Sequence, residues 1–278
     1  MKNHKLTVTG LTIAYKAWGK AKNPPIIALH GWLDNANTFS PLAAYLQDNY
    51  YLIAIDLPGH GLSSHLPLGN NYHFMDGLFT VMRIIDELNF EKVHLLGHSM
   101  GACLCSLLAG VAPERFLSVN LIEGLGPFSS PDETACLQLA KYAQYLQSEN
   151  KPINGYDTFA KAALARSIRG YVSLEIAKIL CERSLAEENG IFYWRHDRRL
   201  LYPSPLKMTE MQVLVCLQEI RVKTCLIWAS SGFSFDSELM QGRIKAIKHL
   251  TIEHLEGGHH VHMEKPEVVG KLLANFMV

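Results

Sequence analysis

The 278-residue chain lacks a net charge, a long apolar run and any pair of cysteines spaced as in a metal site. Lysine and arginine together number 26, as do aspartate and glutamate, so no net field draws the protein to nucleic acid or to an anionic membrane. No apolar run approaches the length that a bilayer crossing requires. These absences argue against a nucleic-acid partner and against a membrane span.

The cysteines and the first residues give an expectation about the compartment. Six cysteines are present, and their spacings do not match those of zinc sites. The opening stretch MKNHKLTVTGLTIAYKAWG has no apolar signal core and alternates like two strands around a glycine turn. Free thiols in a reducing environment are then the default reading, so we expect a cytoplasmic protein and no metal.

Buried strands and amphipathic helices alternate along most of the sequence. Segments of the buried-strand type, Leu-rich or β-branched with little polar alternation, lie at 25–31, 51–58, 93–99, 117–124, 223–230 and 250–257. Amphipathic stretches fall between or after them at 38–47, 72–88, 101–111, 237–248 and 266–276. This βαβ series predicts an α/β fold with a mostly parallel, doubly wound sheet.

One long interval interrupts this alternation. From residue 127 to 218 no strand of the buried type is evident, and three segments read as helices, at 132–147, 155–169 and 173–188. Because a compact domain does not contain so long a structureless loop, we expect residues 127–218 to form a helical cap insertion. Residues 1–126 and 219–278 would then form the core.

A nucleophile motif lies where a buried strand gives way to a buried helix. The stretch LLGHSMGA places Ser99 between Gly97 and Gly101, which is the Gly-x-Ser-x-Gly pattern of a nucleophile elbow. A turn this tight requires neighbours without side chains, and the free N–H groups of the following helix point at negative charge formed there. The other reading is an ordinary glycine-rich turn in which Ser99 only caps the helix.

Together, four stretches resemble the α/β-hydrolase superfamily and, within it, the serine hydrolase-like proteins. These are HGWLDN (30–35), DLPGHGLSSH (56–65), LLGHSMGA (95–102) and GGHHVHMEKP (257–266). The resemblance covers the whole core and weakens in the insertion. It implies an α/β-hydrolase fold with a helical cap and a serine nucleophile, and no metal or organic cofactor.

Carried onto this sequence, the resemblance assigns roles to several residues. Ser99 would be the nucleophile, and the N–H groups of Trp32 and Met100 would form the oxyanion hole. Of three clustered histidines, His259 fits the position of the general base; His262 would pack into the following turn and His260 would lie near the cleft rim.

The acid of the triad is the point at which the sequence departs from the family pattern. The usual aspartate position after the penultimate strand is held by Gly232. Glu123, at the end of another strand, is the favoured replacement, since some members of the superfamily supply the acid there. Asp236 is the alternative, although it directly precedes a helix and is placed to cap it. A Ser–His dyad oriented by water or a backbone carbonyl is the third possibility.

Further residues are candidates for substrate contact. His30, Phe39 and Phe128 are expected to line the substrate site, beside the elbow and the start of the insertion. Arg195, Arg198 and Arg199 form a basic group near the end of the insertion; they either bind an anionic part of a substrate or pair with Asp197 to join cap and core.

These residues predict a carboxylesterase-like serine hydrolase that acts on a small or medium-sized ester through an acyl-enzyme on Ser99. Thioesters, lactones and carbon–carbon bonds are alternative substrates for the same site. The rival from another class is a hydrolase-like protein that binds a small ligand with little or no catalysis.

Overall fold

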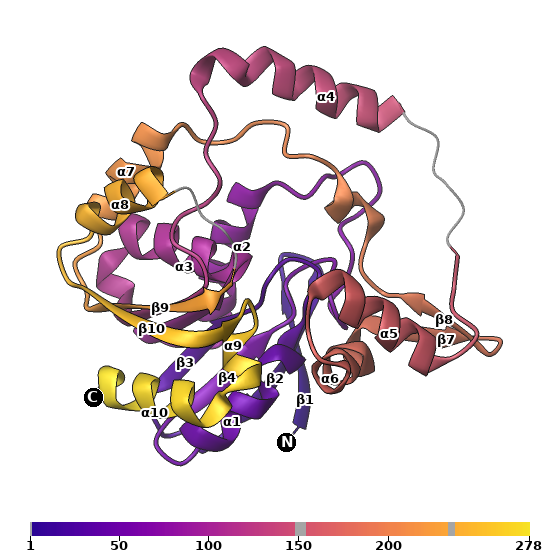
Figure 1. The fold of residues 1–278 in the computed structure, drawn as a ribbon, viewed down its shortest axis with the longest axis horizontal. Coiled ribbons are helices and arrows are strands. Elements are labelled where there is room, and N and C mark those ends of the chain that lie inside the picture. The colour runs from indigo at the N-terminus through magenta and orange to yellow at the C-terminus, as the bar shows by residue number, and fades with distance from the viewer. Residues whose placement is uncertain (1, 148–153, 233–236) are drawn as a thin grey trace.

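A computed structural model describes residues 2–147, 154–232 and 237–278. Its centre is an eight-stranded sheet in the order β1-β2-β4-β3-β5-β6-β9-β10 (Figure 1). The strands of this sheet are β1 Lys2–Val8, β2 Leu11–Trp18, β3 Pro25–Leu29, β4 Tyr51–Ile55, β5 Val93–His98, β6 Phe116–Ile122, β9 Thr224–Ser231 and β10 Leu250–Gly258. β1 pairs antiparallel with β2, and β2 with β4, whereas the six strands from β4 to β10 are parallel.

Helices cover both faces of the sheet because its central strands are apolar on both sides. One core cluster joins the sheet to α2 Phe74–Glu87, α3 Met100–Val111, α7 Glu210–Gln218 and α8 Ser237–Ala246. A second joins the opposite face to α1 Ser40–Leu46 and α10 Pro266–Met277, with Val261 of the short helix α9 Val261–Glu264. The predicted doubly wound α/β fold is therefore confirmed.

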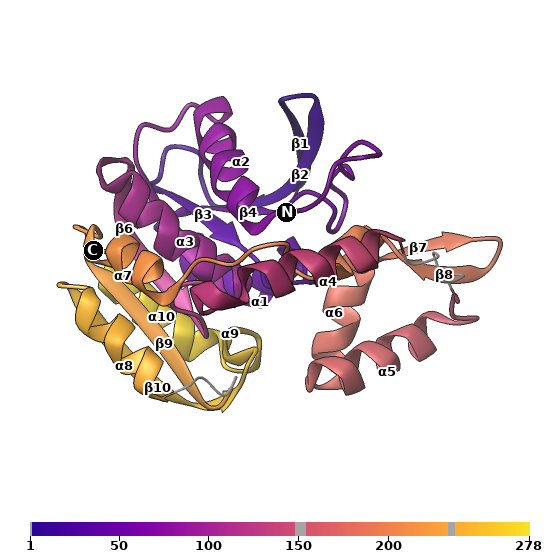
Figure 2. The same ribbon diagram turned by 90° about the horizontal axis from the view of Figure 1, so that it is seen from above.

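The remaining α-helices and strands lie between residues 127 and 209, over one end of the sheet. They are α4 Ala135–Gln147, α5 Phe159–Gly170, α6 Leu174–Ser184, β7 Leu185–Glu188 and β8 Ile191–Trp194. Figures 1 and 2 show α5 and α6 beside the β7–β8 hairpin, with α4 set apart from them. None of the described residues of α4 is buried. α7, which falls within the predicted insertion, packs on the core instead.

The hairpin is the part of this region that the sequence pattern does not reveal. The helix expected over 173–188 ends at Ser184, and residues Leu185–Glu188 pair antiparallel with Ile191–Trp194 around Asn189 and Gly190. Both of these turn residues have positive φ, 52° and 78°. The strands are largely half-buried or exposed, so they lack the continuous apolar run by which the sheet strands are recognised.

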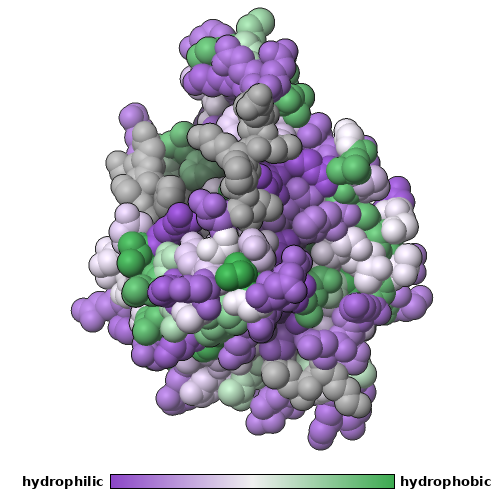
Figure 3. Space-filling model, turned by 90° about the vertical axis from the view of Figure 1, so that its right-hand side faces the viewer, coloured by the Kyte–Doolittle hydropathy of each residue, from purple (hydrophilic) through white to green (hydrophobic). Residues whose placement is uncertain are grey.

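The surface on the hairpin side is mixed. Apart from the grey atoms, hydrophilic residues predominate on this face and hydrophobic ones are scattered among them (Figure 3). None of the described helices combines the length and the apolarity that a bilayer span requires.

Candidate active site

Ser99 lies at a sharp turn between β5 and α3. Its backbone angles, φ 52° and ψ −117°, belong to a region that residues with a side chain rarely adopt. The flanking glycines are required by space: a Cβ on Gly97 would lie 2.5 Å from backbone atoms of Ala102, and one on Gly101 would lie 2.0 Å from the Leu29 carbonyl oxygen. The Gly-x-Ser-x-Gly pattern thus builds the strained turn that the sequence predicts.

The Ser99 side chain is not used as a helix cap. Ser99 occupies the N-cap position of α3, yet its hydroxyl makes no capping hydrogen bond, and no other described residue is hydrogen-bonded to it. Its backbone N–H donates to the Ile122 carbonyl at 2.9 Å, which fixes the turn to the neighbouring strand. The hydroxyl therefore has the freedom that a nucleophile needs, and the capping interpretation has no support.

His259 and Glu123 meet at the ends of two strands that are not neighbours in the sequence. The His259 Nδ1 lies 3.1 Å from Glu123 Oε2, and Glu123 Oε1 accepts a hydrogen bond of 2.6 Å from the Ala229 N–H. The Glu123 side chain is fully buried and its backbone has a positive φ of 55°. Because a carboxylate can only accept from His259, Nδ1 carries the proton and Nε2 is the unprotonated nitrogen of the neutral ring.

The space at Gly232 explains why an acid is absent there. A Cβ built on Gly232 would lie 1.9 Å from Glu123 Oε2, so the Glu123 carboxylate fills the room that a side chain at 232 would need. The glycine that departs from the family pattern and the glutamate on β6 are therefore complementary. Asp236, the alternative acid, lies outside the described residues.

The predicted oxyanion donors lie at two turns beside Ser99. Trp32 follows β3, in a turn whose next residue, Leu33, has φ 60°, and Met100 begins α3. Neither backbone N–H donates to another described residue, as expected of donors kept for a ligand. The Trp32 indole is half-exposed and donates to the Leu200 carbonyl at 3.0 Å, which ties this turn to the segment that follows β8.

Two of the predicted substrate-contact residues are corrected by the structure. His30 is fully buried: its Nδ1 donates to the Gly31 carbonyl at 2.7 Å and its Nε2 accepts from the Leu57 N–H at 3.0 Å. Both ring nitrogens are thus hydrogen-bonded to backbone groups, and burial lowers the pKa of His30. Phe39 is also fully buried, in the core cluster with α1 and α10. Phe128 is 65% exposed, and its predicted contact with substrate stays a prediction.

The other two histidines of the cluster are buried as well. His260 was expected near the cleft rim, but it is 4% exposed and its Nε2 lies 2.9 Å from Asp34 Oδ2. His262 packs behind it, with Nε2 2.8 Å from the Thr38 hydroxyl. Burial lowers the pKa of His262 well below its usual value, and the nearby His260 lowers it further. His262 thus lies in the turn after His259, as predicted, whereas the expectation for His260 is wrong.

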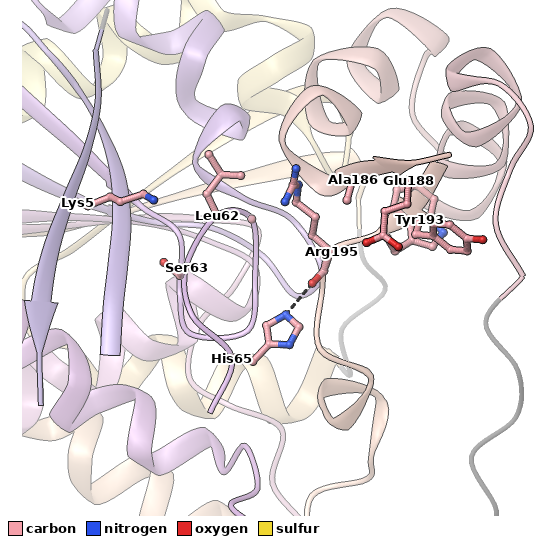
Figure 4. A pocket seen from close by; sticks show the side chains of 10 residues that line it. Lys5, Leu62, Ser63, His65, Ala186, Glu188, Tyr193 and Arg195 are labelled. Atoms are coloured by element: carbon pink, nitrogen blue, oxygen red, sulfur yellow. Dashed lines mark hydrogen bonds between the residues drawn. The ribbon is translucent and has the colours of Figure 1, made fainter. Parts of the chain in front are cut away.

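Within the predicted basic group, Arg199 connects the segment after β8 to the loop that follows residue 65. Arg199 pairs with Asp197 and also donates to the carbonyls of Leu66, Pro67 and Asn70. Arg195 donates through Nε to the Leu185 carbonyl and faces a cavity of about 580 Å³ between the core loop 61–65 and the hairpin (Figure 4). That cavity is lined by none of the predicted catalytic residues.

Next to the predicted catalytic positions lies a buried group whose association the sequence does not reveal. Asp34, His98 and His260 bring three ligand-type atoms within 4.8 Å of one another, and Arg166 of α5 contacts Asp34. Burial alone would raise the pKa of the Asp34 carboxyl, but the charge and hydrogen bond of His260, together with Arg166, hold this pKa well below its usual range. No motif spacing signals this group, because its members come from four separate segments.

The comparisons with known proteins agree with this fold. The model of the α/β-hydrolase fold family matches residues 24–152. A serine hydrolase-like protein of Dictyostelium discoideum is 32% identical over 97% of this chain and 79% of its own length. The chain belongs to the α/β-hydrolases, among the serine hydrolase-like proteins. A second serine hydrolase-like protein, from Danio rerio, is 30% identical over 94% of the chain and 84% of its own length.

Solved structures show the same fold. A hypothetical protein of Pseudomonas aeruginosa superposes with a TM-score of 0.92 at 33% identity, over 100% of this hydrolase and 98% of that chain. A thioesterase domain from the curacin biosynthetic pathway superposes with a TM-score of 0.85 at 28% identity, over 99% of both chains.

Proposed function

We propose that this serine hydrolase-like protein cleaves an ester of a small or medium-sized substrate through a covalent acyl-enzyme on Ser99. The observation that carries the proposal is the hydrogen bond of 3.1 Å between His259 Nδ1 and the buried Glu123 carboxylate. It fixes the imidazole tautomer that leaves Nε2 able to accept a proton. A histidine that only filled space would not need this carboxylate partner.

The proposed reaction follows from the groups in place. Nε2 of His259 takes the proton of Ser99 as its oxygen attacks the ester carbonyl, and the N–H groups of Trp32 and Met100 hold the oxygen anion of the tetrahedral intermediate. His259 then protonates the leaving alcohol, which leaves the acyl group on Ser99. A water molecule, deprotonated by the same nitrogen, attacks the acyl-enzyme; the acid is released as His259 returns this proton to the Ser99 oxygen.

No hydrogen bond joins Ser99 to His259 in the described residues. In serine hydrolases such bonds are often long before substrate binds and shorten in the complex. The rings of His98 and His259 lie 4.8 Å apart between centroids, so the imidazole of His259 lies next to the residue that precedes the nucleophile. A rotation of either side chain is the rearrangement that substrate binding has to produce.

The rival function, ligand binding with a degenerate triad, draws on the glycine at 232. The Glu123 carboxylate occupies that space, which weakens the argument. Within enzymes, the similarity to the curacin thioesterase domain favours thioesters as a second substrate class. Oxygen esters and thioesters of one acyl series, tested with purified protein, separate the possibilities. A sharp optimum of chain length with oxygen esters supports our proposal, a preference for thioesters supports the second class, and binding without turnover supports the rival.

A further inference from the structure

A buried chain of polar side chains connects the cap to the loop that carries His259. It consists of Arg166 on α5, Asp34 in the turn after β3, and two histidines. His98 directly precedes Ser99, and His260 directly follows His259. Asp34, His98 and His260 are each less than 5% exposed. Because unpartnered polar groups are costly in such a place, the contacts among these residues determine how the surrounding loops sit.

Two of these contacts position the backbone at His259 and at the next residue, His260. The His98 Nε2 lies 2.9 Å from the His259 carbonyl oxygen, and the His260 Nε2 lies 2.9 Å from Asp34 Oδ2. A carbonyl and a carboxylate only accept, so both Nε2 atoms carry protons and donate. The backbone of His259 is therefore fixed by His98, and its next residue is fixed by Asp34.

Asp34 is held in turn by the cap. Arg166 Nη2 lies 2.5 Å from Asp34 Oδ1. The adjacent Asn35 donates to the Leu180 carbonyl and to the Ser184 hydroxyl of α6, so the same turn contacts two cap helices. The Asp34 N–H also donates to the Gly31 carbonyl at 3.1 Å. Asp34 thus joins three parts: the turn of the proposed oxyanion hole, the His259 loop and the cap.

A metal ion is the other reading of this group, since Asp34, His98 and His260 are ligand types in close proximity. Charge argues against it. Arg166 already neutralises the Asp34 carboxylate, and the pKa of His98 is lowered well below its usual value by burial and by the neighbouring histidines, so that ring is neutral. A divalent cation would leave about two uncompensated charges in a buried site, which is strongly unfavourable.

We propose that Asp34 is a positioning residue for His259 and that Arg166 makes its position depend on the cap. This inference rests on the proposed function, in which His259 is the base. When α5 packs on the core, Arg166 pairs with Asp34. Asp34 then holds His260 by its hydrogen bond, and this orients the ring of the preceding His259 toward Ser99. Without Arg166 the buried carboxylate has lost its cationic partner and the loop relaxes.

The test compares Arg166→Met with Arg169→Met, a matched change on the exposed side of the same helix. Turnover of p-nitrophenyl acetate is expressed per active site titrated with a fluorophosphonate, so that unfolded protein does not count. We expect Arg166→Met and Asp34→Asn each to lower kcat ten- to hundredfold with KM changed less than threefold. The double variant should fall no further than either single one, Arg166→Lys should recover part of the loss, and Arg169→Met should match the parent protein.

A purely structural role would lower the melting temperature and the titratable fraction but leave kcat per titrated site unchanged; that result, or an additive double variant, overturns the inference. If the parent protein turns over no ester, the proposed function fails, and the coupling is judged from the ring NMR signals of His259. These signals must shift in Arg166→Met and not in Arg169→Met. Unchanged signals in both variants would contradict the coupling, whatever the activity.

Discussion

Replacing Glu123 by glutamine tests the proposed triad at the position where this protein departs from the family pattern. The change keeps the shape of the side chain and removes its charge. In the parent, Oε1 accepts from the Ala229 N–H at 2.6 Å and Oε2 accepts from His259 Nδ1 at 3.1 Å. A glutamine has one oxygen, which the Ala229 N–H retains. The NH₂ group then faces His259 and can only donate, so Nδ1 has to be unprotonated to accept its hydrogen bond.

The consequence is the wrong tautomer of His259. With Nδ1 unprotonated, Nε2 carries the proton and cannot accept one from Ser99. Flipping the amide would restore the tautomer but would leave the Ala229 N–H buried without a partner, at a cost of about 1–3 kcal/mol. We expect kcat to fall about 10³- to 10⁴-fold, the order seen when a triad carboxylate becomes an amide, which corresponds to about 4–5.5 kcal/mol in the barrier.

The assay is steady-state hydrolysis of p-nitrophenyl acetate, with circular dichroism to show that the variant is folded. Asp236→Asn is the matched comparison, since it makes the same chemical change at the alternative acid, and we expect it to cost little. A Glu123→Gln variant within tenfold of the parent, or a larger loss for Asp236→Asn, would refute the assignment of Glu123. The fold would be unaffected by either result.

Three further predictions concern the same core. Because a side chain at 232 would collide with the Glu123 carboxylate, Gly232→Asp alone should inactivate the enzyme. Adding Glu123→Gly to Gly232→Asp should raise kcat at least tenfold above that of Gly232→Asp alone. Asp56 and Arg183 form a buried ion pair at 2.7 Å, so Asp56→Asn should destabilise the fold by about 3–5 kcal/mol in urea titrations; a loss under 1 kcal/mol would contradict this. Burial lowers the pKa of His60 to about 3, so the unfolded chain, with a His pKa near 6.5, binds a proton that the folded protein does not. The free energy of unfolding therefore falls as the pH drops below about 6.5, and His60→Asn should reduce its slope against pH by about 1.4 kcal/mol per pH unit between about pH 6 and 4. An unchanged slope would count against a neutral buried ring.

The sheet and the elbow are predictable from sequence because their determinants are local. A strand buried on both faces must be apolar throughout, and a turn as tight as that of Ser99 tolerates only glycine at Gly97 and Gly101. Such requirements leave a pattern that can be read without knowing the neighbours. The six parallel strands and the position of the turn at Ser99 follow directly from it.

The roles of His30, Phe39 and His260 could not be obtained in that way. Each lies in a segment next to a predicted functional position, yet each is buried by elements distant in sequence. His30, for example, is held by the Leu57 N–H after β4, and His260 by Asp34. A histidine beside a catalytic residue has the same local sequence whether it faces the cleft or the core.

Glu123 is an intermediate case, which the sequence predicts only in part. The sequence shows a missing acid at 232 and a carboxylate at the end of a neighbouring strand, which makes Glu123 a hypothesis with rivals. Only the three-dimensional arrangement shows that its carboxylate fills the space at Gly232 and lies 3.1 Å from His259. Complementarity between two positions 109 residues apart in the chain cannot be read from either one.

The central claim, that Ser99 is an activated nucleophile, is tested most directly by labelling the protein with a fluorophosphonate and locating the adduct by mass spectrometry. We predict one phosphonyl group per chain, attached to Ser99, no labelling of Ser99→Ala, and slow labelling of His259→Gln. A folded protein whose Ser99 does not react, or one labelled equally well after Ser99→Ala, would contradict the proposed mechanism.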